Sequence, residues 1–254
     1  MHILVTNDDG VTHPSLLALA QEMRKLGEVT VLAPDRNWSA SGHVKTLHRP
    51  LRVKEVRLAD GSPALASDGA PSDCVVLALL GLARPRPEIV VSGINPTANL
   101  GHDVTYSGTV TAAMEGAIWG LPAVAVSLDV SPGGPAEHDF GPAARVAGRV
   151  VQRVIEKGLP KNVLLNVNVP DLPEAQIQGL RLTRMGLRVY HDALDVRKDP
   201  RGRPYYWIGG EAPGGIPEEG TDFGALAQGC VSITPLSLDL TAHQALPELD
   251  GWRF

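Results

Sequence analysis

Two adjacent carboxylates, Asp8 and Asp9, stand near the start of the chain between the β-branched run HILVTN and Gly10. Neighbouring carboxylates repel each other unless a cation or a shared proton compensates their charge, and their oxygens suit a divalent metal. The sequence Asn-Asp-Asp-Gly is also good material for a turn and a helix cap. This segment alone therefore leaves a metal site and an ordinary turn both open.

Two further segments carry polar oxygens of the kind that a hard cation binds. The segment RNWSASGH offers the hydroxyls of Ser39 and Ser41, and SGINPTANLG offers the side-chain carbonyls of Asn95 and Asn99. Mg²⁺ and Mn²⁺ prefer carboxylate, amide and hydroxyl oxygens to softer ligands. The three segments together favour a metal site over three unrelated turns.

A third feature is suited to binding an anion. Ser107, Gly108 and Thr109 come directly before VTAAMEGAIWG, whose small and apolar residues predict a buried helix over residues 108–119. With Ser107 as the N-cap, free backbone N–H groups and the helix dipole favour an anion in front of this helix. A well-capped core helix is the alternative interpretation. Beside a metal site, an anion cradle is what phosphoester chemistry needs.

The elements that must position these residues alternate along the chain. Hydrophobic periodicity predicts helices over residues 14–26, 71–82, 108–119, 140–156 and 222–228, and strands over residues 2–7, 28–34, 88–92, 123–128, 162–169 and 230–234. This alternation predicts an α/β protein with a doubly wound, mainly parallel sheet. Ligands bind outside the carboxyl ends of the strands in such sheets, which is where the polar segments fall.

The chain changes character near Gly179. The pattern of residues 181–210 predicts two β arms around the turn DPRGRP, which form a projecting hairpin. Arginines and tyrosines in this hairpin suggest nucleic-acid contact, but Asp192, Asp195 and Asp199 interleave with them and cancel much of the positive field. We therefore expect an oligomer contact. Residues 1–178 are expected to form the catalytic core, and residues 179–254 to complete the same domain with the hairpin and a C-terminal segment.

Composition excludes several classes of protein. The 254 residues are 43% hydrophobic and 20% charged, which is typical of a globular chain. A net charge of −5 without a basic tract predicts no stable nucleic-acid partner. The longest apolar run, residues 74–82, is half of what a bilayer crossing needs, so we expect neither a membrane span nor a secretory signal. Cys74 and Cys230 are expected to be buried free thiols in a reducing cytoplasm.

Six segments of the chain together resemble the SurE survival-protein family of metal-dependent nucleoside monophosphate phosphatases. They are MHILVTNDDG, APDRNWSASGH, DGAPSDCV, VSGINPTANLGHDVTYSGTVTAAMEG, LNVNVP and GTDFGALAQGCVSITPL, between Met1 and about Leu240. The resemblance implies a Rossmann-like core, hydrolysis of nucleoside 5′- and 3′-monophosphates, some cleavage of polyphosphate, and one Mg²⁺ or Mn²⁺ per subunit. It also implies a homodimer or homotetramer built with the hairpin at residues 184–208 and the C-terminal segment.

The resemblance also implies roles for individual residues. The family's metal ligands fall on Asp8, Asp9, Ser39 and Asn95. Its phosphate-binding segment falls on Ser107, Gly108 and Thr109, and the two aspartates are the catalytic residues. These positions coincide with those that the residue types alone select.

Two other functions are weighed against a phosphatase of this kind. A haloacid-dehalogenase-type phosphatase needs a nucleophilic aspartate where this chain has Asn7, and an amide cannot form an aspartyl phosphate. A nucleotide-sensing module without catalysis could use the same fold. The chain has neither G-x-G-x-x-G nor G-x-x-x-x-G-K-[ST], and sensing leaves the aspartate pair without a task.

Overall fold

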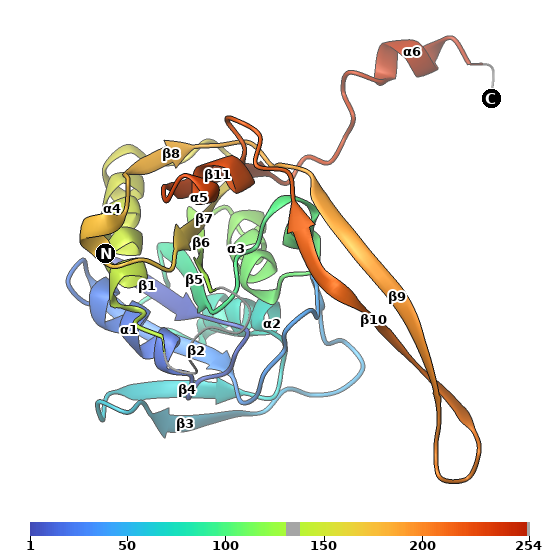
Figure 1. Ribbon diagram of the computed structural model, residues 1–254. Coiled ribbons are helices and arrows are strands. Elements are labelled where there is room, and N and C mark those ends of the chain that lie inside the picture. Colours follow the sequence, from blue (N-terminus) through green and yellow to red (C-terminus); the bar gives the residue numbers. More distant parts are fainter. Residues whose placement is uncertain (131–137, 253–254) are drawn as a thin grey trace.

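The computed structural model describes residues 1–130 and 138–252. Figure 1 shows a central twisted sheet with helices on both faces and a long two-stranded ribbon that projects from it. The strands are β1 (His2–Thr6), β2 (Glu28–Pro34), β3 (Val53–Arg57), β4 (Pro63–Ser67), β5 (Ile89–Asn95), β6 (Ala123–Asp129), β7 (Val163–Pro170), β8 (Leu180–Leu182), β9 (Arg188–Lys198), β10 (Pro204–Gly215) and β11 (Val231–Ser237). The helices are α1 (Pro14–Met23), α2 (Pro71–Leu77), α3 (Gly108–Ile118), α4 (Gly141–Lys157), α5 (Asp222–Ala227) and α6 (Leu246–Asp250).

In the described parts of the chain, nine strands form one sheet in the order β3-β4-β2-β1-β5-β6-β7-β11-β8. Neighbouring strands from β4 to β7 are all parallel, whereas β3 and β11 run antiparallel to β4 and β7. Helices α1, α3 and α4 connect parallel strands as crossovers of the kind that such sheets require. The predicted doubly wound, mainly parallel α/β sheet is confirmed.

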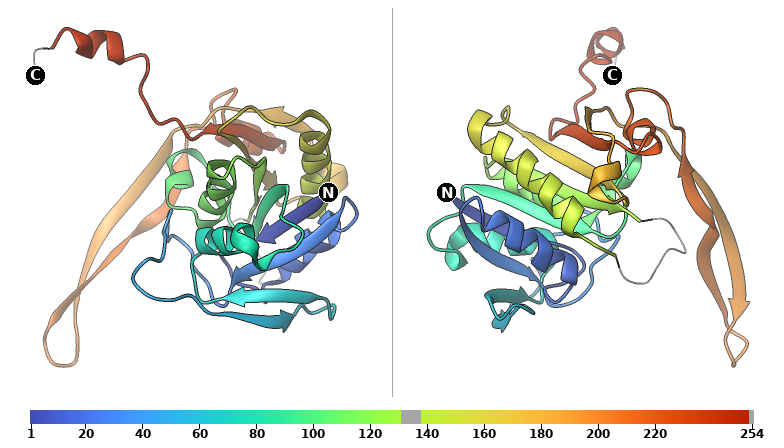
Figure 2. Two further views of the ribbon diagram at one scale, coloured as in Figure 1. Left: turned by 180° about the vertical axis from the view of Figure 1, so that it is seen from behind. Right: turned by 60° about the vertical axis from the view of Figure 1, so that its left-hand side comes forward.

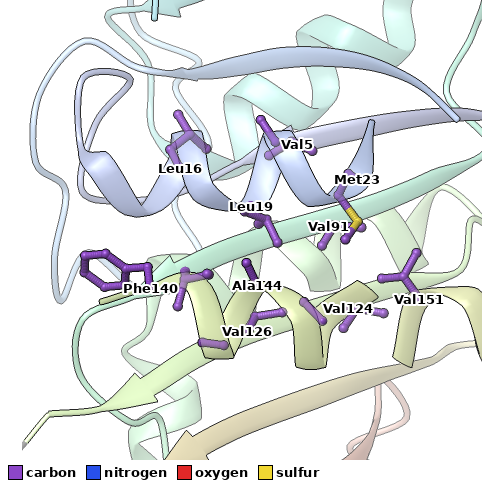
Figure 3. Close-up of a cluster of buried hydrophobic side chains, with 14 of the residues drawn as sticks. Val5, Leu16, Leu19, Met23, Val91, Val124, Val126, Phe140, Ala144 and Val151 are labelled. Carbon is purple, nitrogen blue, oxygen red and sulfur yellow. The ribbon is translucent and has the colours of Figure 1, made fainter. Parts of the chain in front are cut away.

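Two apolar cores hold the helices against the two faces of the sheet. Figure 3 shows Leu19 and Met23 of α1 facing Ala144 and Val151 of α4 above the strands, and all four side chains are buried. Figure 2 shows these two helices side by side on one face. Helices α2 and α3 pack on the other face in a second cluster. Because helices are packed on both faces, the strands are held firmly and the edge where the parallel strands end has a fixed position.

Part of the first half of the chain differs from the prediction. The helix expected over residues 71–82 ends at Leu77, and a π-helical turn follows over Ala78–Leu82. Gly81 adopts a φ of 125° in this turn, a conformation outside the α-helical region that glycine tolerates. Strands β3 and β4 were not predicted, because the short segment PALAS of β4 lacks the β-branched residues typical of strands.

The predicted hairpin is present, but its first arm is shorter and its second arm longer than expected. Strands β9 and β10 pair antiparallel around the turn at residues 199–203, apart from the main sheet. The first arm begins at Arg188, because Leu180–Leu182 instead forms β8 at the edge of the main sheet beside β11, and the second arm extends to Gly215. Figure 1 shows that α6, within the expected polar tail, also lies away from the sheet.

Both cysteines are buried and unpaired, so the prediction of free thiols is confirmed for Cys74 and Cys230. Burial raises the pKa of the Cys74 thiol well above its usual value, with a smaller contribution from the charge of Asp73. Across residues 1–130 and 138–252, none of the helices is both long enough and apolar enough to cross a bilayer.

Candidate functional site

Asp8 lies directly beyond the carboxyl end of β1 and is 2% exposed. Its backbone carbonyl accepts a hydrogen bond of 2.7 Å from the N–H of Trp38, and its Oδ1 accepts one from the hydroxyl of Thr109. Burial raises the pKa of the Asp8 carboxyl, although the Thr109 hydroxyl and the backbone N–H groups of Thr109 and Gly108 oppose this effect. The side chain is therefore held in place while its charge is poorly compensated.

The negative charge of Asp9 is also poorly compensated. Burial and then the charge of Asp8 raise its pKa to about 7. Its Oδ2 is a buried oxygen with no hydrogen-bond partner in the described part of the chain. Buried polar atoms are ordinarily paired, so an unpaired carboxylate oxygen beside a second carboxylate marks a place for a ligand of positive charge.

Asn7 closes the turn that presents the aspartate pair. Its amide nitrogen donates to the carbonyl of Gly10 at 3.0 Å, and its side-chain oxygen accepts from the N–H of Gly10 at 3.2 Å. Both ends of this buried side chain are therefore used in holding the turn. The residue at the position of a haloacid-dehalogenase nucleophile thus has a structural task.

The segment that carries Ser39 is tied to the aspartate pair through its neighbour. Trp38 donates its N–H to the carbonyl of Asp8, which brings the exposed Ser39 to the same edge of the sheet. Farther along, Gly42 donates its N–H to the carbonyl of Tyr106 at 2.9 Å. The segment after β2 thus reaches both the turn after β1 and the start of α3.

Asn95 is the last residue of β5, whose neighbour in the sheet is β1. The register pairs Thr6 with Ser92, so Asn95 and Asp8 leave adjacent strands at the same edge. The amide nitrogen of Asn95 donates to the carbonyl of Thr97 in its own loop. Its side-chain carbonyl is the group that it can offer to a ligand.

Asn99, the second candidate in this loop, holds the fold together. Its amide nitrogen donates to the Ser127 hydroxyl at 2.8 Å, and its backbone N–H donates to Asn168 at 2.8 Å. Its backbone carbonyl accepts from the side chains of Asn166 and Asn168. These bonds anchor the loop to β6 and β7, so Asn99 has a structural task in this loop.

The start of α3 faces Asp8. Ser107 caps the helix, and its hydroxyl accepts from the N–H of Val110 at 3.1 Å. The Thr109 hydroxyl and the first backbone N–H groups are directed at the Asp8 carboxylate, an anion that the helix dipole favours at this end. The structure therefore brings the aspartate pair and residues 107–109 together.

One further charged side chain, in the second half of α3, was not predicted. Glu115 is buried on α3 and accepts from His43 at 2.9 Å and from the indole of Trp119 at 3.0 Å. Burial opposes its ionisation, but these hydrogen bonds outweigh it and lower the pKa of Glu115. The one signal in the sequence is an acidic residue among the small apolar residues of AAMEGAI, which marks a buried charge with a partner elsewhere.

The fold and this edge define a class of protein. The sheet is a Rossmann-like α/β sheet, and its strand ends bring an aspartate pair against a capped helix N-terminus. The family model for survival protein SurE matches residues 3–192. The chain belongs to the SurE family.

Two curated relatives and one solved structure are similar to this chain over nearly its whole length. A protein of Herpetosiphon aurantiacus named 5'-nucleotidase SurE is 58% identical over 243 residues, which cover 95% of this chain and 94% of the relative. A protein of Chloroflexus aggregans with the same name is 52% identical over the full length of both chains. The crystal structure of the Sure protein from Aquifex aeolicus is 41% identical and covers 98% of each chain, with a TM-score of 0.84.

Proposed function

We propose that this chain is a metal-dependent phosphatase that hydrolyses nucleoside 5′- and 3′-monophosphates to nucleoside and phosphate, with short polyphosphate as a further substrate. The observation that carries the proposal is the aspartate pair with raised pKa values, set against the N-terminus of α3. The shared name of the relatives, 5'-nucleotidase SurE, supports a nucleotide substrate.

The residues present fit a hard divalent cation. The unpartnered Oδ2 of Asp9 is an oxygen donor, and a cation beside it would lower the pKa values of both aspartates. Asp8, Asp9, Ser39 and Asn95 would hold one Mg²⁺ or Mn²⁺ per subunit with carboxylate, hydroxyl and amide oxygens. Among the described residues no group of three or more His, Cys, Asp or Glu can hold a metal ion, so hydroxyl and amide oxygens and water would complete the coordination.

In the proposed mechanism, the chain positions the substrate and balances its charge. When bound, the cation would supply a more acidic water and neutralise charge on the phosphoryl oxygens. The backbone N–H groups and hydroxyls of residues 107–109 would bind and orient the phosphoryl group. Thr109 couples the two parts, because its hydroxyl already contacts Asp8.

Phosphate release from a panel of nucleoside 5′- and 3′-monophosphates tests this function. We expect release with Mg²⁺ or Mn²⁺, none after treatment with a chelator, and recovery when the cation is returned. Short polyphosphate and a non-nucleotide phosphomonoester in the same panel define the substrate class. Tight nucleotide binding without phosphate release would instead support a sensing module, and phosphate trapped covalently on the protein would support an aspartyl-phosphate mechanism.

We further propose that the protein is a cytoplasmic homodimer or homotetramer without a nucleic-acid partner. Large apolar side chains of the hairpin are exposed in the single chain, including Leu194 at 67% and Ile208 at 85%. Exposed apolar surface of this kind is typical of a protein interface. The C-terminal segment adds Leu240, which is 91% exposed. The two unpaired buried cysteines support a reducing compartment.

The double substitution Leu194→Asp with Ile208→Asp tests the assembly. These residues are directly paired across the hairpin and exposed in the single chain, so charge there costs the fold little but opposes burial in an interface. We expect sedimentation velocity to show a shift to the mass of the monomer. Leu80→Asp is the control and should leave the mass unchanged, because Leu80 is 67% exposed and lies outside the hairpin. An unchanged mass of the double variant would contradict an interface through the hairpin.

A further inference from the structure

A cluster of three polar side chains joins the base of the hairpin to the turn before α3. Asp103 lies in the 3-10 helical turn Gly101–Thr105. Its Oδ2 is 2.7 Å from Nη2 of Arg188, and its Oδ1 accepts a 2.7 Å hydrogen bond from the hydroxyl of Tyr190. Both partners come from the first residues of β9. One carboxylate in the core is therefore held by two side chains of the hairpin.

The ion pair between Arg188 and Asp103 is largely shielded from water, whereas Tyr190 is 42% exposed. The side chains of Arg188 and Asp103 are 14% and 19% exposed, and the guanidinium lies 5.7 Å from the ring centroid of Phe223. Arg188 also carries the charge that opposes the raised pKa of Asp129. Burial and the neighbouring Asp103 raise the pKa of Tyr190 to about 12, so its hydroxyl is a proton donor at neutral pH. Removing one partner of a shielded ion pair leaves the other charge uncompensated and strongly destabilises the structure around it.

The backbone of Asp103 extends this constraint to the start of α3. Its carbonyl accepts hydrogen bonds from the N–H groups of Tyr106 at 2.9 Å and Ser107 at 3.1 Å. Ser107 in turn caps α3, and Thr109 in the first turn contacts Asp8. Hydrogen bonds and the short stretches of backbone between them therefore connect the hairpin base to Asp8.

We propose that Asp103, Arg188 and Tyr190 are positioning residues that hold residues 107–109 in the orientation that receives the substrate phosphoryl group. This inference rests on the proposed function of residues 107–109. The three residues act through the backbone of the turn and need not touch the substrate. Small displacements of a binding segment weaken catalysis strongly, which is why a rigid support of this segment matters.

Two nearly isosteric substitutions test the proposal. Asp103→Asn keeps an acceptor for Tyr190 but removes the charge opposite Arg188, and Tyr190→Phe removes one hydroxyl. For Asp103→Asn we expect the KM for the nucleotide and the inhibition constant of inorganic phosphate to rise about tenfold, which corresponds to one charge-assisted hydrogen bond. Tyr190→Phe should move both constants in the same direction by less. The affinity for Mn²⁺ should stay unchanged in both variants.

Amide hydrogen exchange supplies a readout that does not depend on turnover. We expect faster exchange at residues 106–110 in both variants, with wild-type exchange in the strands of the main sheet. Arg184→Gln and Tyr206→Phe are the matched controls. Arg184 makes an exposed ion pair with Glu218, and Tyr206 is 59% exposed on the hairpin. Both control variants should match the wild type in every measurement.

The outcomes separate the inference from the proposed function. A wild type that releases no phosphate overturns the proposed function, while phosphate binding and hydrogen exchange still test the positioning role. An active wild type whose two variants keep normal KM, phosphate inhibition and exchange overturns the inference. A general fall in melting temperature together with loss of Mn²⁺ affinity also overturns it, because it shows a role in overall stability. If Asp103→Asn does not fold, Tyr190→Phe decides alone.

Discussion

Asp8→Asn is expected to lower metal-dependent phosphate release by about a thousandfold or more, because a bound cation contributes several kcal/mol to transition-state stabilisation and each 1.36 kcal/mol is tenfold in rate. The substitution removes one negative charge from the proposed ligand set. An asparagine oxygen can still accept from the Thr109 hydroxyl, so the local geometry is kept. Initial rates of phosphate release with saturating Mn²⁺ measure the effect.

Although the activity of Asp8→Asn should fall, the folding stability of the metal-free variant should rise relative to that of the wild type. Burial raises the pKa of Asp8, so its ionised form is unfavourable in the folded metal-free protein. Asp9 has a pKa of about 7, so the wild type in chelator is expected to lose stability as the pH rises through about 7. Asp8→Asn should lose less, because Asp9 then ionises without a charged neighbour. Thermal melts in chelator at pH 5.5 and pH 8 measure this difference.

Asp171→Asn is the control for both measurements. Asp171 lies just beyond β7 and pairs with His138 at 3.2 Å, outside the proposed ligand set. We expect wild-type turnover and a normal gain of melting temperature with Mn²⁺ in this variant, whereas Asp8→Asn should gain little. Asp8→Asn with near-normal turnover would refute the assignment of the aspartate pair.

The sequence predicted the strands and the polar segments at their ends because both depend on local pattern. Buried β-branched runs predict β1, β2 and β5, and a short polar segment after each run marks the ligand edge. The edge pair β3 and β4 was missed since its short, partly exposed strands carry little periodic signal. Strand β8 was merged with the hairpin because an exposed Leu-Arg-Leu segment is as typical of a hairpin arm as of a sheet edge.

The contacts that complete the candidate site join residues that are distant in the chain. The Thr109 hydroxyl and Asp8 are 101 residues apart, and the Tyr190 hydroxyl and Asp103 are 87 residues apart. No local periodicity encodes such a pair. Asn99 shows the converse problem, because its residue type fits a metal ligand while its bonds to β6 and β7 fix a loop. Residue type identifies candidate ligand residues, but only the packing of the sheet shows which of them can face a ligand and which hold a loop in place.

Gly108→Ala is expected to lower kcat/KM about a hundredfold through a displacement near 1 Å at the site. Gly108 is the first residue of α3, and its φ is not positive, so its backbone conformation suits alanine. Alanine also favours helices over glycine by about 1 kcal/mol. The contact with Asp8 opposes the change, since a Cβ at this position would lie 2.7 Å from Cβ and 2.9 Å from Oδ2 of Asp8. Either Asp8 or the start of α3 must move.

Gly141→Ala separates this contact from a general effect of alanine at a helix start. Gly141 is the first residue of α4, where a Cβ would meet the flexible ends of Asp139 and Arg145 at 2.9 and 3.0 Å. These side chains can move into solvent, so steady-state kinetics should match the wild type. We also expect Gly108→Ala to lose about 1–3 kcal/mol of unfolding free energy, the usual range for overpacking. Wild-type kinetics in Gly108→Ala would show that close approach of α3 to Asp8 does not matter for catalysis, because the one atom added lies between them.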